Sequence, residues 1–451
     1  MQVTIIGGGS YQWGPSLMAD LLLTPCFADG GHLVLEDLDP APLVKMEALA
    51  RRMIDHLGVS ATVATPTDQR QALDRADFVV VTISTGGFAS MSVDLDVPAR
   101  HGIRQSVGDS VGPGGINRSL RNIPVLVGIA RDMEQVCPDA WMLNITNPMT
   151  ALTRSVRKET SIRAVGLCHE VGNFTFDLAI ALGLPHTAVH PTVSGVNHFP
   201  VVTALEVDGR DGFEVIAELV DSVGGMAALA PDPARPEPEP MSRLDWGVRN
   251  YLKLSMLQRW GVIPAAGDRH LAEFLPSILT EASDWGAAWG VSLTPMSDRE
   301  KDQAEFVELV DQQLAGAERL HTWKSGEMMA DVIDSLVTGT PRELPVNIPN
   351  TGQCPDLPLE AVVESMCVID DTGVRGRDQA RVPPAVAELL RRQVATQELT
   401  VQAALAGDRG LIDQAFALDP LAGRGDLHDL EAMVDELLAG TARWLPQPAA
   451  V

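Results

Sequence analysis

A cysteine and a histidine about thirty residues apart are the side chains of this sequence best suited to hold a metal ion. Cys168 lies in a Gly-Leu-Cys-His-Glu segment, and His198 lies in a Gly-Val-Asn-His-Phe segment. Each follows an apolar run that predicts a buried strand, over residues 164–167 and 188–196. Open α/β sheets place their chemistry at strand ends, where a thiolate and an imidazole suit Mn²⁺, Zn²⁺, Fe²⁺ or Co²⁺. The alternative is a buried cysteine and a hydrogen-bonded core histidine.

The first forty residues predict a site for a dinucleotide. An apolar strand expected over Val3–Ile6 runs into three glycines and Ser10, and a helix is expected over residues 15–24. A strand, a glycine-rich turn and a helix together seat a pyrophosphate on the helix N-terminus. We therefore expect Gly7, Gly9 and Ser10 to contact a cofactor. The motif G-x-G-x-x-G is incomplete, because position 12 is glutamine.

The next expected strand, His32–Leu35, supports this prediction because it ends in Glu36 and Asp37. A carboxylate at that place hydrogen-bonds the adenosine ribose and favours NAD over NADP. We favour Asp37 for this role. The alternative is a pair of solvated acids in a turn.

Two later strand ends also carry polar residues. The buried strand expected over residues 78–84 opens into a Gly-Gly pair, so Ser84 and Gly86 are expected at the cofactor. The strand expected over residues 141–145 is followed by Asn147, whose amide suits a sugar hydroxyl or a nicotinamide, although Asn-Pro alone is more often a turn. Residues 100–122 are polar and glycine-rich, which predicts a ligand-binding loop that contains Asp109, followed by a helix over 118–137.

These elements predict an α/β fold in two domains. Residues 1–195 alternate strands and helices, as a Rossmann-like doubly wound parallel sheet does, and are expected to bind NAD. Residues 196–451 are expected to form a mixed α+β, mostly helical domain for substrate, metal and oligomer contacts, as in a lactate/malate-dehydrogenase-like architecture. The other expected elements are an antiparallel strand over 201–207, helices over 40–57, 246–260, 383–406 and 426–438, and an exposed proline-rich segment over 231–240.

The composition excludes several classes of function. The chain has 451 residues and a formal net charge of −26, which repels nucleic acid and anionic membranes. No apolar run is long enough to span a membrane, and the N-terminus resembles a strand more than a signal peptide. Five cysteines without a pairing pattern fit a reducing compartment. We therefore expect a cytoplasmic protein with a small-molecule substrate and no nucleic-acid or membrane partner.

Several motifs in the same order resemble the NAD-dependent family 4 glycosidases over nearly the whole chain. They are Gly-Gly-Gly-Ser, Val-Gly-Asp-Ser-Val-Gly-Pro-Gly-Gly, Thr-Asn-Pro, Gly-Leu-Cys-His-Glu, Gly-Val-Asn-His-Phe and Gly-Asp-Arg-His-Leu-Ala-Glu-Phe. The Cys-His-Glu form with Gly-Asp-Arg-His downstream is similar to the α-galactosidase and α-uronidase side of the family. The related NAD-dependent sulfoquinovosidases form a similar fold group. The resemblance implies a homodimer or homotetramer.

The resemblance implies a redox-neutral hydrolysis of a glycoside. NAD⁺ takes a hydride from C3 of the sugar, which acidifies the proton on C2. A base removes that proton, the aglycone leaves C1 by elimination, water adds back, and the hydride returns. In this scheme a metal ion, Mn²⁺ first, is held by Cys168 and His198 and stabilises the enediolate.

The resemblance also implies roles for other residues. Tyr251 and Asp268 are the two candidates for the C2 base: the family often uses a tyrosine, and Asp268 lies in the motif of the uronidase and galactosidase branch. His169 or Glu170 is expected to protonate the leaving oxygen, although a supporting role beside the metal ligands or a helix N-terminal charge would also explain them. The residues expected to contact the substrate are Asn147, Asn197, Arg269, His270, Glu170 and Asp109.

Charge predicts the class of sugar. Phospho-glycosidases tend to carry an arginine before the Gly-Gly of the fourth strand, and this chain has Thr85 there, so a 6-phosphate is not expected. Cations and aromatic residues near the expected pocket favour an anionic C6 group, a uronide or a sulfoquinovoside; they are Arg104, Arg118, Arg249, Lys253, Arg269, His270, Trp285 and Trp289. The alternative is that they bind NAD phosphates or make structural ion pairs. A neutral α-galactoside or α-glucoside is then the expected substrate.

Two hypotheses come from other functional classes. A plain NAD-dependent dehydrogenase of the 2-hydroxyacid type would need no Cys/His metal pair and would accumulate NADH. A catalytically silent NAD-binding regulator would bind the cofactor but would not depend on Cys168 or His198.

Overall fold

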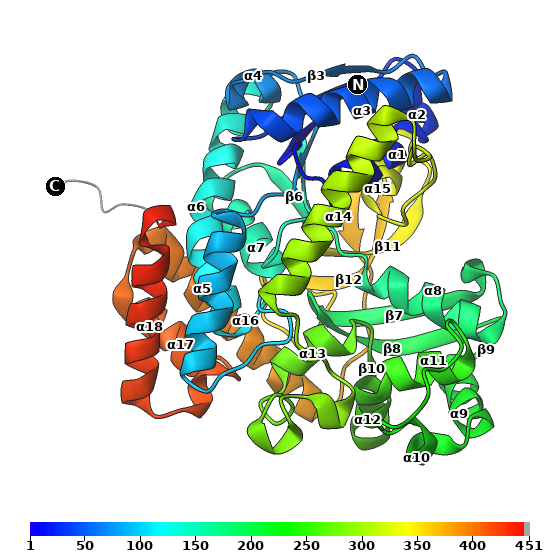
Figure 1. The fold of residues 1–451 in the computed structure, drawn as a ribbon, viewed down its shortest axis with the longest axis vertical. Helices are drawn as coiled ribbons and strands as arrows, with labels where there is room; N and C mark the ends of the chain where they lie inside the picture. Colours follow the sequence, from blue (N-terminus) through cyan, green and yellow to red (C-terminus); the bar gives the residue numbers. More distant parts are fainter. Residues whose placement is uncertain (446–451) are drawn as a thin grey trace.

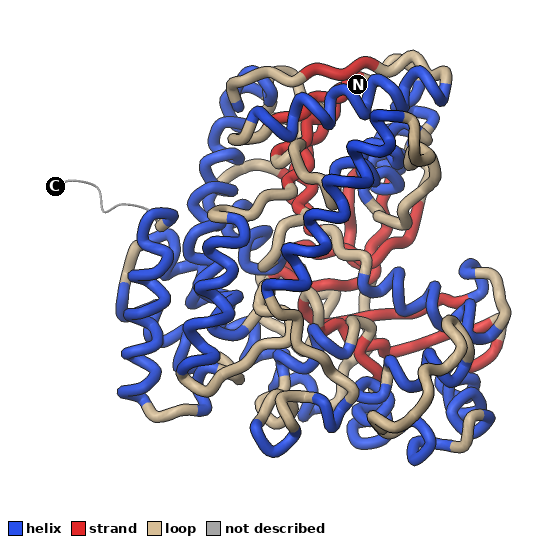
Figure 2. Tube along the Cα trace, in the orientation of Figure 1, coloured by secondary structure: helices blue, strands red, loops and turns tan. Residues whose placement is uncertain are grey.

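One β-sheet runs through the whole protein and is flanked by helices (Figures 1 and 2). The computed structural model describes residues 1–445, and residues 446–451 lie outside the described part. Within residues 1–445, thirteen strands join this sheet in the order β10-β8-β7-β12-β11-β6-β5-β4-β1-β2-β3, with β13 beside β12 and β9 beside β8. The strands are β1 Gln2–Ile6, β2 His32–Glu36, β3 Thr62–Ala64, β4 Phe78–Val81, β5 Trp141–Asn144, β6 Arg163–Gly166, β7 Val189–Val196, β8 Phe199–Val207, β9 Arg210–Asp211, β10 Ile263–Pro264, β11 Arg342–Pro349, β12 Val362–Asp370 and β13 Gly373–Gly376.

The helices follow the strands on the N-terminal side and dominate the C-terminal side. They are α1 Gly14–Leu22, α2 Pro25–Ala28, α3 Pro40–Leu57, α4 Gln69–Leu73, α5 Gly87–Arg100, α6 Gly112–Val136, α7 Met149–Glu159, α8 Glu170–Leu182, α9 Gly212–Ser222, α10 Gly225–Leu229, α11 Arg243–Arg249, α12 Tyr251–Trp260, α13 Asp268–Phe274, α14 Met296–Ala315, α15 Met329–Thr338, α16 Pro384–Ala406, α17 Arg409–Leu418 and α18 Leu427–Thr441. None of the helices in residues 1–445 has the length and apolar character needed to cross a membrane.

Six parallel strands form one half of the sheet, in the order β3-β2-β1-β4-β5-β6. Strand β4, Phe-Val-Val-Val, is buried along its whole length, as expected for a parallel strand covered on both faces. This strand order is that of a doubly wound dinucleotide-binding sheet. The predicted Rossmann-like fold is therefore confirmed.

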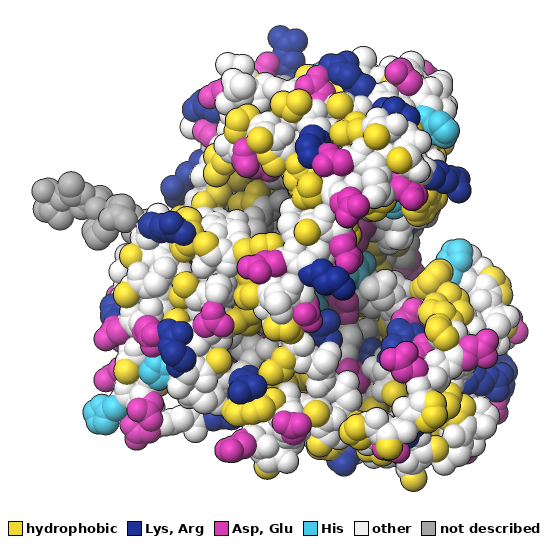
Figure 3. All heavy atoms as spheres, viewed as in Figure 1, with side chains coloured by type: hydrophobic (Ala, Val, Ile, Leu, Met, Phe, Trp, Pro, Cys, Tyr) yellow, Lys and Arg dark blue, Asp and Glu magenta, His cyan; other side chains and the backbone are white. Residues whose placement is uncertain are grey.

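The other half of the sheet is antiparallel. Strand β11 joins it to the parallel half through a single pairing, Asn347 with Gly166, and β12, β7, β8 and β10 follow. Strands β7 and β8 are joined by the two-residue turn Asn197-His198. The lobe made by β7–β9 and α8–α12 projects from the molecule, and Figure 3 shows a hollow between this lobe and the parallel half.

The core of the parallel half is completed by residues from much later in the chain. Val3, Ile5 and Leu33 belong to the same buried cluster as Ile333 and Val346. The sheet and this core both cross the expected boundary near residue 195, so the division into domains 1–195 and 196–451 stays a prediction.

Three of the differences from the predicted elements concern residues of the expected site. Helix α6 begins at Gly112 and not near residue 118, because Pro113 in its first turn already has a helical φ and lacks the N–H that would be left unpaired there. Strand β4 ends at Val81, which leaves Ser84 in the following loop. The helix expected over 246–260 is two helices, because Asn250 leaves helical geometry between α11 and α12.

Candidate active site

A cavity of about 680 Å³ opens where the parallel strands end. All seven residues predicted to contact the cofactor line it, and they follow four different strands: Gly7, Gly9, Ser10, Asp37, Ser84, Gly86 and Asn147. Carboxyl ends of parallel strands meet at one edge of a sheet, which explains why residues so far apart in sequence converge. Their role as cofactor contacts remains a prediction.

The turn after β1 has room only for glycine. Gly7 has a φ of +89°, and a Cβ there would lie 2.0 Å from the carbonyl oxygen of Thr82. The Gly9 N–H donates to Asp37 Oδ2 at 3.1 Å, so the carboxylate at the end of β2 holds the turn. Helix α1 follows with no acidic residue in its first turn and no side-chain cap. Its free N–H groups and dipole favour an anion, so the residues present fit a dinucleotide pyrophosphate.

Polar residues line another part of the cavity. Asn147 Nδ2 donates to Asp109 Oδ2 at 3.3 Å, and Arg118 Nε donates to the Asn147 carbonyl at 3.1 Å. Asn147 Oδ1 is buried and has no hydrogen-bond partner within the described residues. A buried acceptor without a partner is costly, so this atom fits a hydroxyl or amide donor from a bound ligand.

Asp109, His198 and His270 form a candidate metal centre beside that polar part. Their ligand atoms all lie within 4.8 Å of one another. The imidazole rings of His198 and His270 have centroids 3.8 Å apart, and His270 Nδ1 is buried without a hydrogen-bond partner within residues 1–445. One carboxylate and two imidazoles suit a borderline divalent cation. His198 was predicted as a metal ligand, whereas Asp109 and His270 were predicted as substrate contacts.

The hairpin turn between β7 and β8 positions His198. His198 has a φ of +64°, an uncommon value for a residue with a side chain, and it is buried. Its Nδ1 lies 2.7 Å from Ser110 Oγ, and the same hydroxyl donates to Asp109 Oδ1 at 2.7 Å. Ser110 therefore joins two members of the cluster, and it was missed because a serine in a loop carries no signal of its own.

Burial and mutual charge set the protonation of this cluster. Burial and the neighbouring His270 lower the pKa of His198 to about 3, which leaves its imidazole neutral, the form that binds metal. Burial alone would raise the pKa of Asp109, but His270, His198 and Arg118 together hold it well below its usual range. The cluster thus presents a carboxylate and a neutral imidazole.

Cys168 follows β6 and lies near the buried carboxylate of Glu364. Burial, with Glu364 and Glu170 nearby, raises the pKa of the Cys168 thiol well above its ordinary value, and Asn197 hydrogen-bonds to it. Asn197 Nδ2 also donates to Glu364 Oε2 at 3.2 Å, while Glu364 Oε1 is buried without a partner within residues 1–445. Cys168 is not among the three clustered ligand atoms, and its predicted metal role stays a prediction. Glu364 was missed, although a glutamate inside the apolar run Val362–Ile369 is a visible signal.

His169 and Glu170 begin α8 next to this group. His169 Nδ1 lies 2.9 Å from Glu327 Oε1, and its Nε2 lies 3.6 Å from Glu170 Oε1. Burial would lower the pKa of His169, but Glu327 and Glu170 raise it overall. Glu170 Oε2 accepts from the Gly267 N–H at 2.5 Å. The role of either residue as proton donor stays a prediction, and Glu327 is a partner that the sequence did not reveal.

The two candidates for the C2 base are neighbours in space. Asp268 begins α13 and accepts from the N–H groups of Leu252 at 2.7 Å and Lys253 at 3.2 Å, at the start of α12. Burial raises the pKa of Asp268 to about 6. Tyr251 is the first residue of α12, and the centroid of its ring lies 6.4 Å from that of Trp289. The choice between them stays open.

The cations named from the sequence divide into two groups. Arg104, Arg249 and Arg269 are exposed, Arg104 over the ring of Trp285 and Arg249 paired with Asp245 and Asp177. Lys253 is buried next to Asp268, and Arg118 lines the cavity. Arg299, which the sequence did not single out, also lines the cavity.

Glu273 and Arg299 hold the loop that carries Asp109. Glu273 Oε1 accepts from the N–H groups of Val107 at 2.7 Å and Gly108 at 2.8 Å, and Arg299 Nη2 donates to the Val107 carbonyl at 2.7 Å. Burial raises the pKa of Glu273 to about 8. Helix α13 therefore supplies both His270 and the carboxyl group that fixes the Asp109 loop.

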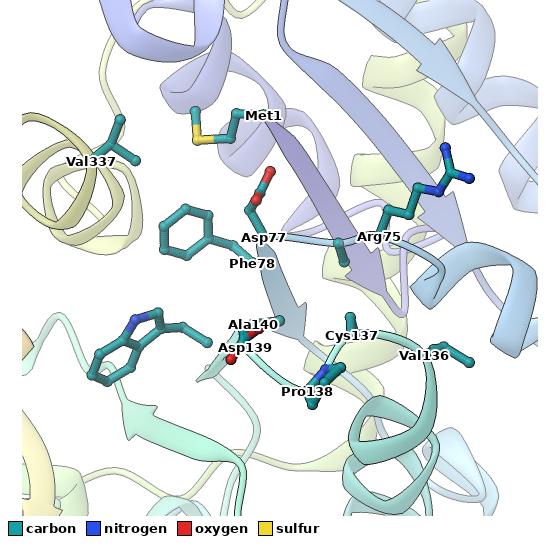
Figure 4. Close-up of a pocket in the computed structure, with 12 residues that line it drawn as sticks. Met1, Arg75, Asp77, Phe78, Val136, Cys137, Pro138, Asp139, Ala140 and Val337 are labelled. Carbon is teal, nitrogen blue, oxygen red and sulfur yellow. The ribbon is translucent and has the colours of Figure 1, made fainter.

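A second hollow, of about 650 Å³, lies at the opposite end of the parallel strands (Figure 4). Phe78 and Trp141 line it where β4 and β5 begin, together with Asp77 and Arg75. Sheets of this kind bind their ligands at the carboxyl ends of the strands, so we do not include this hollow in the site.

Comparison with known proteins finds relatives that match nearly the whole chain. A relative described as the α-galacturonidase of Bacillus subtilis (strain 168) is 34% identical over 97% of this chain and 97% of its own length. The α-galactosidase of the same organism is 31% identical over 99% of each chain. The crystal structure of lplD from Bacillus subtilis has a TM-score of 0.86 and 32% identity, and covers 97% of this chain and 99% of that one. A 6-phospho-α-glucosidase from gut microorganisms, solved with NAD and Mn²⁺, shares the fold at a TM-score of 0.80 and 19% identity over 99% of each chain.

Two family models match in succession. The model of the family 4 glycosyl hydrolases matches residues 2–184, and that of the family 4 glycosyl hydrolase C-terminal domain matches residues 193–422. Together they span most of the chain. The chain belongs to family 4 of the glycosyl hydrolases.

Proposed function

We propose that this chain hydrolyses an α-glycoside with an acidic group at C6, and that it uses NAD⁺ and a divalent metal ion. The leading candidate substrate is an α-galacturonide, and the leading candidate metal is Mn²⁺. The observation that carries the proposal is the position of Asp109. This residue lines the dinucleotide-type cavity and also belongs to the metal-ligating cluster with His198 and His270. A hydride acceptor and a Lewis acid would therefore lie beside the same sugar, the first near a carbon that loses hydride and the second near the oxygen atoms that become anionic.

The residues fit both groups. Gly7, Gly9, Ser10, Asp37, Ser84, Gly86 and Asn147 would hold NAD⁺, and His198 would hold the metal with Asp109 and His270, or with Cys168. When bound, NAD⁺ supplies a hydride acceptor and the metal supplies positive charge beside oxygen atoms that become anionic. The structures of family relatives that contain NAD and Mn²⁺ support this assignment.

The chain's own residues would then move the protons. Asp268 or Tyr251 accepts the C2 proton, and the raised pKa of Asp268, about 6, is close to that of an effective general base. His169, held by Glu327, carries a proton for the leaving oxygen. Asn147 and Asn197 orient the sugar through their amides.

The acidic C6 group is supported by the cations in the cavity. Arg118 and Arg299 both line it, and Arg299 Nε is buried without a hydrogen-bond partner within the described residues. A guanidinium with a free N–H pairs well with a carboxylate. The relatives that are named α-galacturonidases support the same substrate class. A relative named α-galactosidase makes the neutral galactoside the main competitor.

The test is release of nitrophenol from α-galacturonide, α-glucuronide, α-galactoside, α-glucoside and α-sulfoquinovoside, with Mn²⁺, reductant and NAD⁺ far below the substrate concentration. Many turnovers per NAD⁺ without build-up of NADH are expected, with the galacturonide as best substrate. Because Arg299 also holds the Asp109 loop, Arg299→Gln is expected to lower kcat/KM on both substrates, with a further loss of about tenfold or more on the galacturonide relative to the galactoside. The matched control is Arg210→Gln, an exposed arginine paired with Glu218. Stoichiometric NADH with intact glycoside would instead establish the dehydrogenase hypothesis.

A further inference from the structure

Trp444 reaches the cofactor cavity from far along the chain. It lies in the short 3₁₀ turn Ala442–Trp444 after α18, yet it lines the same cavity as Gly7 and Asp37. The C-terminal family model matches residues 193–422, so α18 and Trp444 lie beyond the matched part. None of the site residues expected from the sequence comes from this segment.

Helix α18 is fixed against α5, the helix that begins at Gly87 beside the cavity (Figure 1). Gly440 packs on Val93, and a Cβ at Gly440 would lie 2.7 Å from Val93 Cγ1. Glu436 accepts from Arg100 and lies 3.0 Å from His101 Nε2. The position of Trp444 therefore follows from a packed helix.

A buried chain of hydrogen bonds connects the end of α18 to the loop after β4. Thr441 Oγ1 donates to Asn117 Oδ1 at 3.2 Å, and Asn117 Nδ2 donates to Asp94 Oδ1 at 2.8 Å. Arg121 Nη1 donates to the same Asp94 oxygen at 3.0 Å, while its Nε donates to the Thr85 carbonyl at 3.0 Å. The side chains of Asp94 and Arg121 are fully buried. This network fixes Trp444 relative to the Thr85–Gly86 loop.

The indole fills space that Gly86 leaves free. Gly86 has a φ of +85°, and a Cβ there would lie 2.7 Å from Trp444 Cε2. The guanidinium of Arg443 lies 3.8 Å from the centre of a Trp444 ring. The apolar lining of the cavity includes Leu38, Phe88, Val125 and Ile129 with Trp444, whereas Asp109, Arg118, Asn147 and Arg299 supply polar lining.

We propose that Trp444 is a binding residue for the dinucleotide and that its indole packs against the adenine ring. The inference rests on the proposed use of NAD⁺. A planar, apolar base suits an aromatic wall, and stacking on such a wall contributes substantially to affinity. The polar lining remains for the nicotinamide and the sugar.

The experiment is calorimetric titration of the full chain with NAD⁺, ADP-ribose and nicotinamide mononucleotide. Trp444→Ala is expected to weaken binding of NAD⁺ and ADP-ribose about tenfold, which corresponds to about 1.4 kcal/mol, and to leave nicotinamide mononucleotide unchanged. Trp444→Phe is expected to keep most of the affinity. The matched control is Trp323→Ala, an exposed tryptophan stacked on His321 away from the cavity lining.

A second readout does not depend on how the alanine variant folds. Energy transfer from tryptophan to bound NADH is expected to fall in Trp444→Phe at saturating NADH and to stay unchanged in Trp323→Phe. Equal NAD⁺ affinity of Trp444→Ala and the parent chain, or unchanged energy transfer in Trp444→Phe, would overturn the inference alone. Failure of the parent chain to bind NAD⁺ would overturn the proposed function as well, so the two failures are distinguishable.

Discussion

At the scale of single residues, Asp109 links the two parts of the site. Its carboxylate accepts from Asn147 in the cavity and from Ser110, which also contacts His198. A shift of this one side chain would therefore change both the polar part of the cavity and the candidate metal centre.

Removing a cluster ligand is expected to weaken metal binding. His270→Ala and Asp109→Asn should each raise the Kd for Mn²⁺ about 10- to 100-fold, because the first removes a ligand nitrogen and the second removes the negative charge of a ligand carboxylate. The electron paramagnetic resonance signal of free Mn²⁺ measures this directly, and Cys168→Ser measured alongside tests the thiolate. His190→Ala, an exposed histidine on β7, is the control. If His270→Ala titrates like the control, the cluster does not hold the metal.

Glu273 is expected to make stability depend on pH. Burial raises its pKa from 4.5 to about 8, so the folded state keeps a proton that the unfolded state releases. Protonated Glu273 therefore contributes to the free energy of unfolding at low pH, and this contribution is lost as pH rises from about 4.5 through 8. Glu273→Gln has no proton to lose, so its stability relative to the parent chain should increase between pH 5 and 8, by at most about 1.4 kcal/mol per pH unit. The midpoints of urea unfolding at each pH measure this difference in stability. The control is Glu206→Gln, at an exposed position. Parallel pH profiles for Glu273→Gln and the parent chain would contradict the prediction.

At the scale of elements, the first turn of α6 positions the Asp109 loop by close packing. A Cβ at Gly115 would lie 2.5 Å from the carbonyl carbon of Ser110. Gly128, in the same helix, has nothing within 4 Å of that position. The two glycines therefore form a matched pair, one in contact with the loop and one exposed.

Gly115→Ala is expected to displace the loop. It should destabilise the fold by about 1–3 kcal/mol and weaken Mn²⁺ binding, because Ser110 and Asp109 must move. Gly128→Ala should leave Mn²⁺ binding unchanged and stabilise the helix by up to about 1 kcal/mol. Denaturant unfolding and Mn²⁺ titration measure both variants; equal effects of the two substitutions would refute a role for close packing at Gly115.

Elements with local signals were predictable from the sequence, and contacts between distant elements were not. The helix over residues 40–57 has its predicted bounds, and the residues after β1, β2, β4 and β5 meet in one cavity as the parallel order requires. His270 lies on α13, and no local pattern brings α13 to the β7–β8 hairpin. Glu327, Arg299 and Trp444 likewise reach the site only through tertiary packing.

At the scale of the whole molecule, the shared sheet and core make the two halves interdependent. A fragment of residues 1–195 would lack Ile333 and Val346, which complete the core around Val3 and Ile5. Such a fragment is expected to lack a cooperative unfolding transition and to bind no NAD⁺, and adding residues 196–451 in trans should restore binding in part. Circular dichroism and calorimetry measure this. A cooperatively folded 1–195 fragment that binds NAD⁺ would support the expected domain boundary instead.

The oligomeric state is a second property of the whole molecule. The family resemblance implies a homodimer or homotetramer. Light scattering is expected to give two or four times the chain mass of 48.3 kDa, and a value equal to one chain would contradict it.

The seam between β6 and β11 also has a consequence during synthesis on the ribosome. Strand β6 leaves the ribosome early, but its antiparallel neighbour β11 is made only with residues 342–349. At ordinary elongation rates the nascent chain carries an open strand edge for about 10–35 s. Open edges pair with other chains, so the nascent chain is prone to aggregate during this interval. Chaperones that bind the nascent chain during this interval should therefore improve its yield.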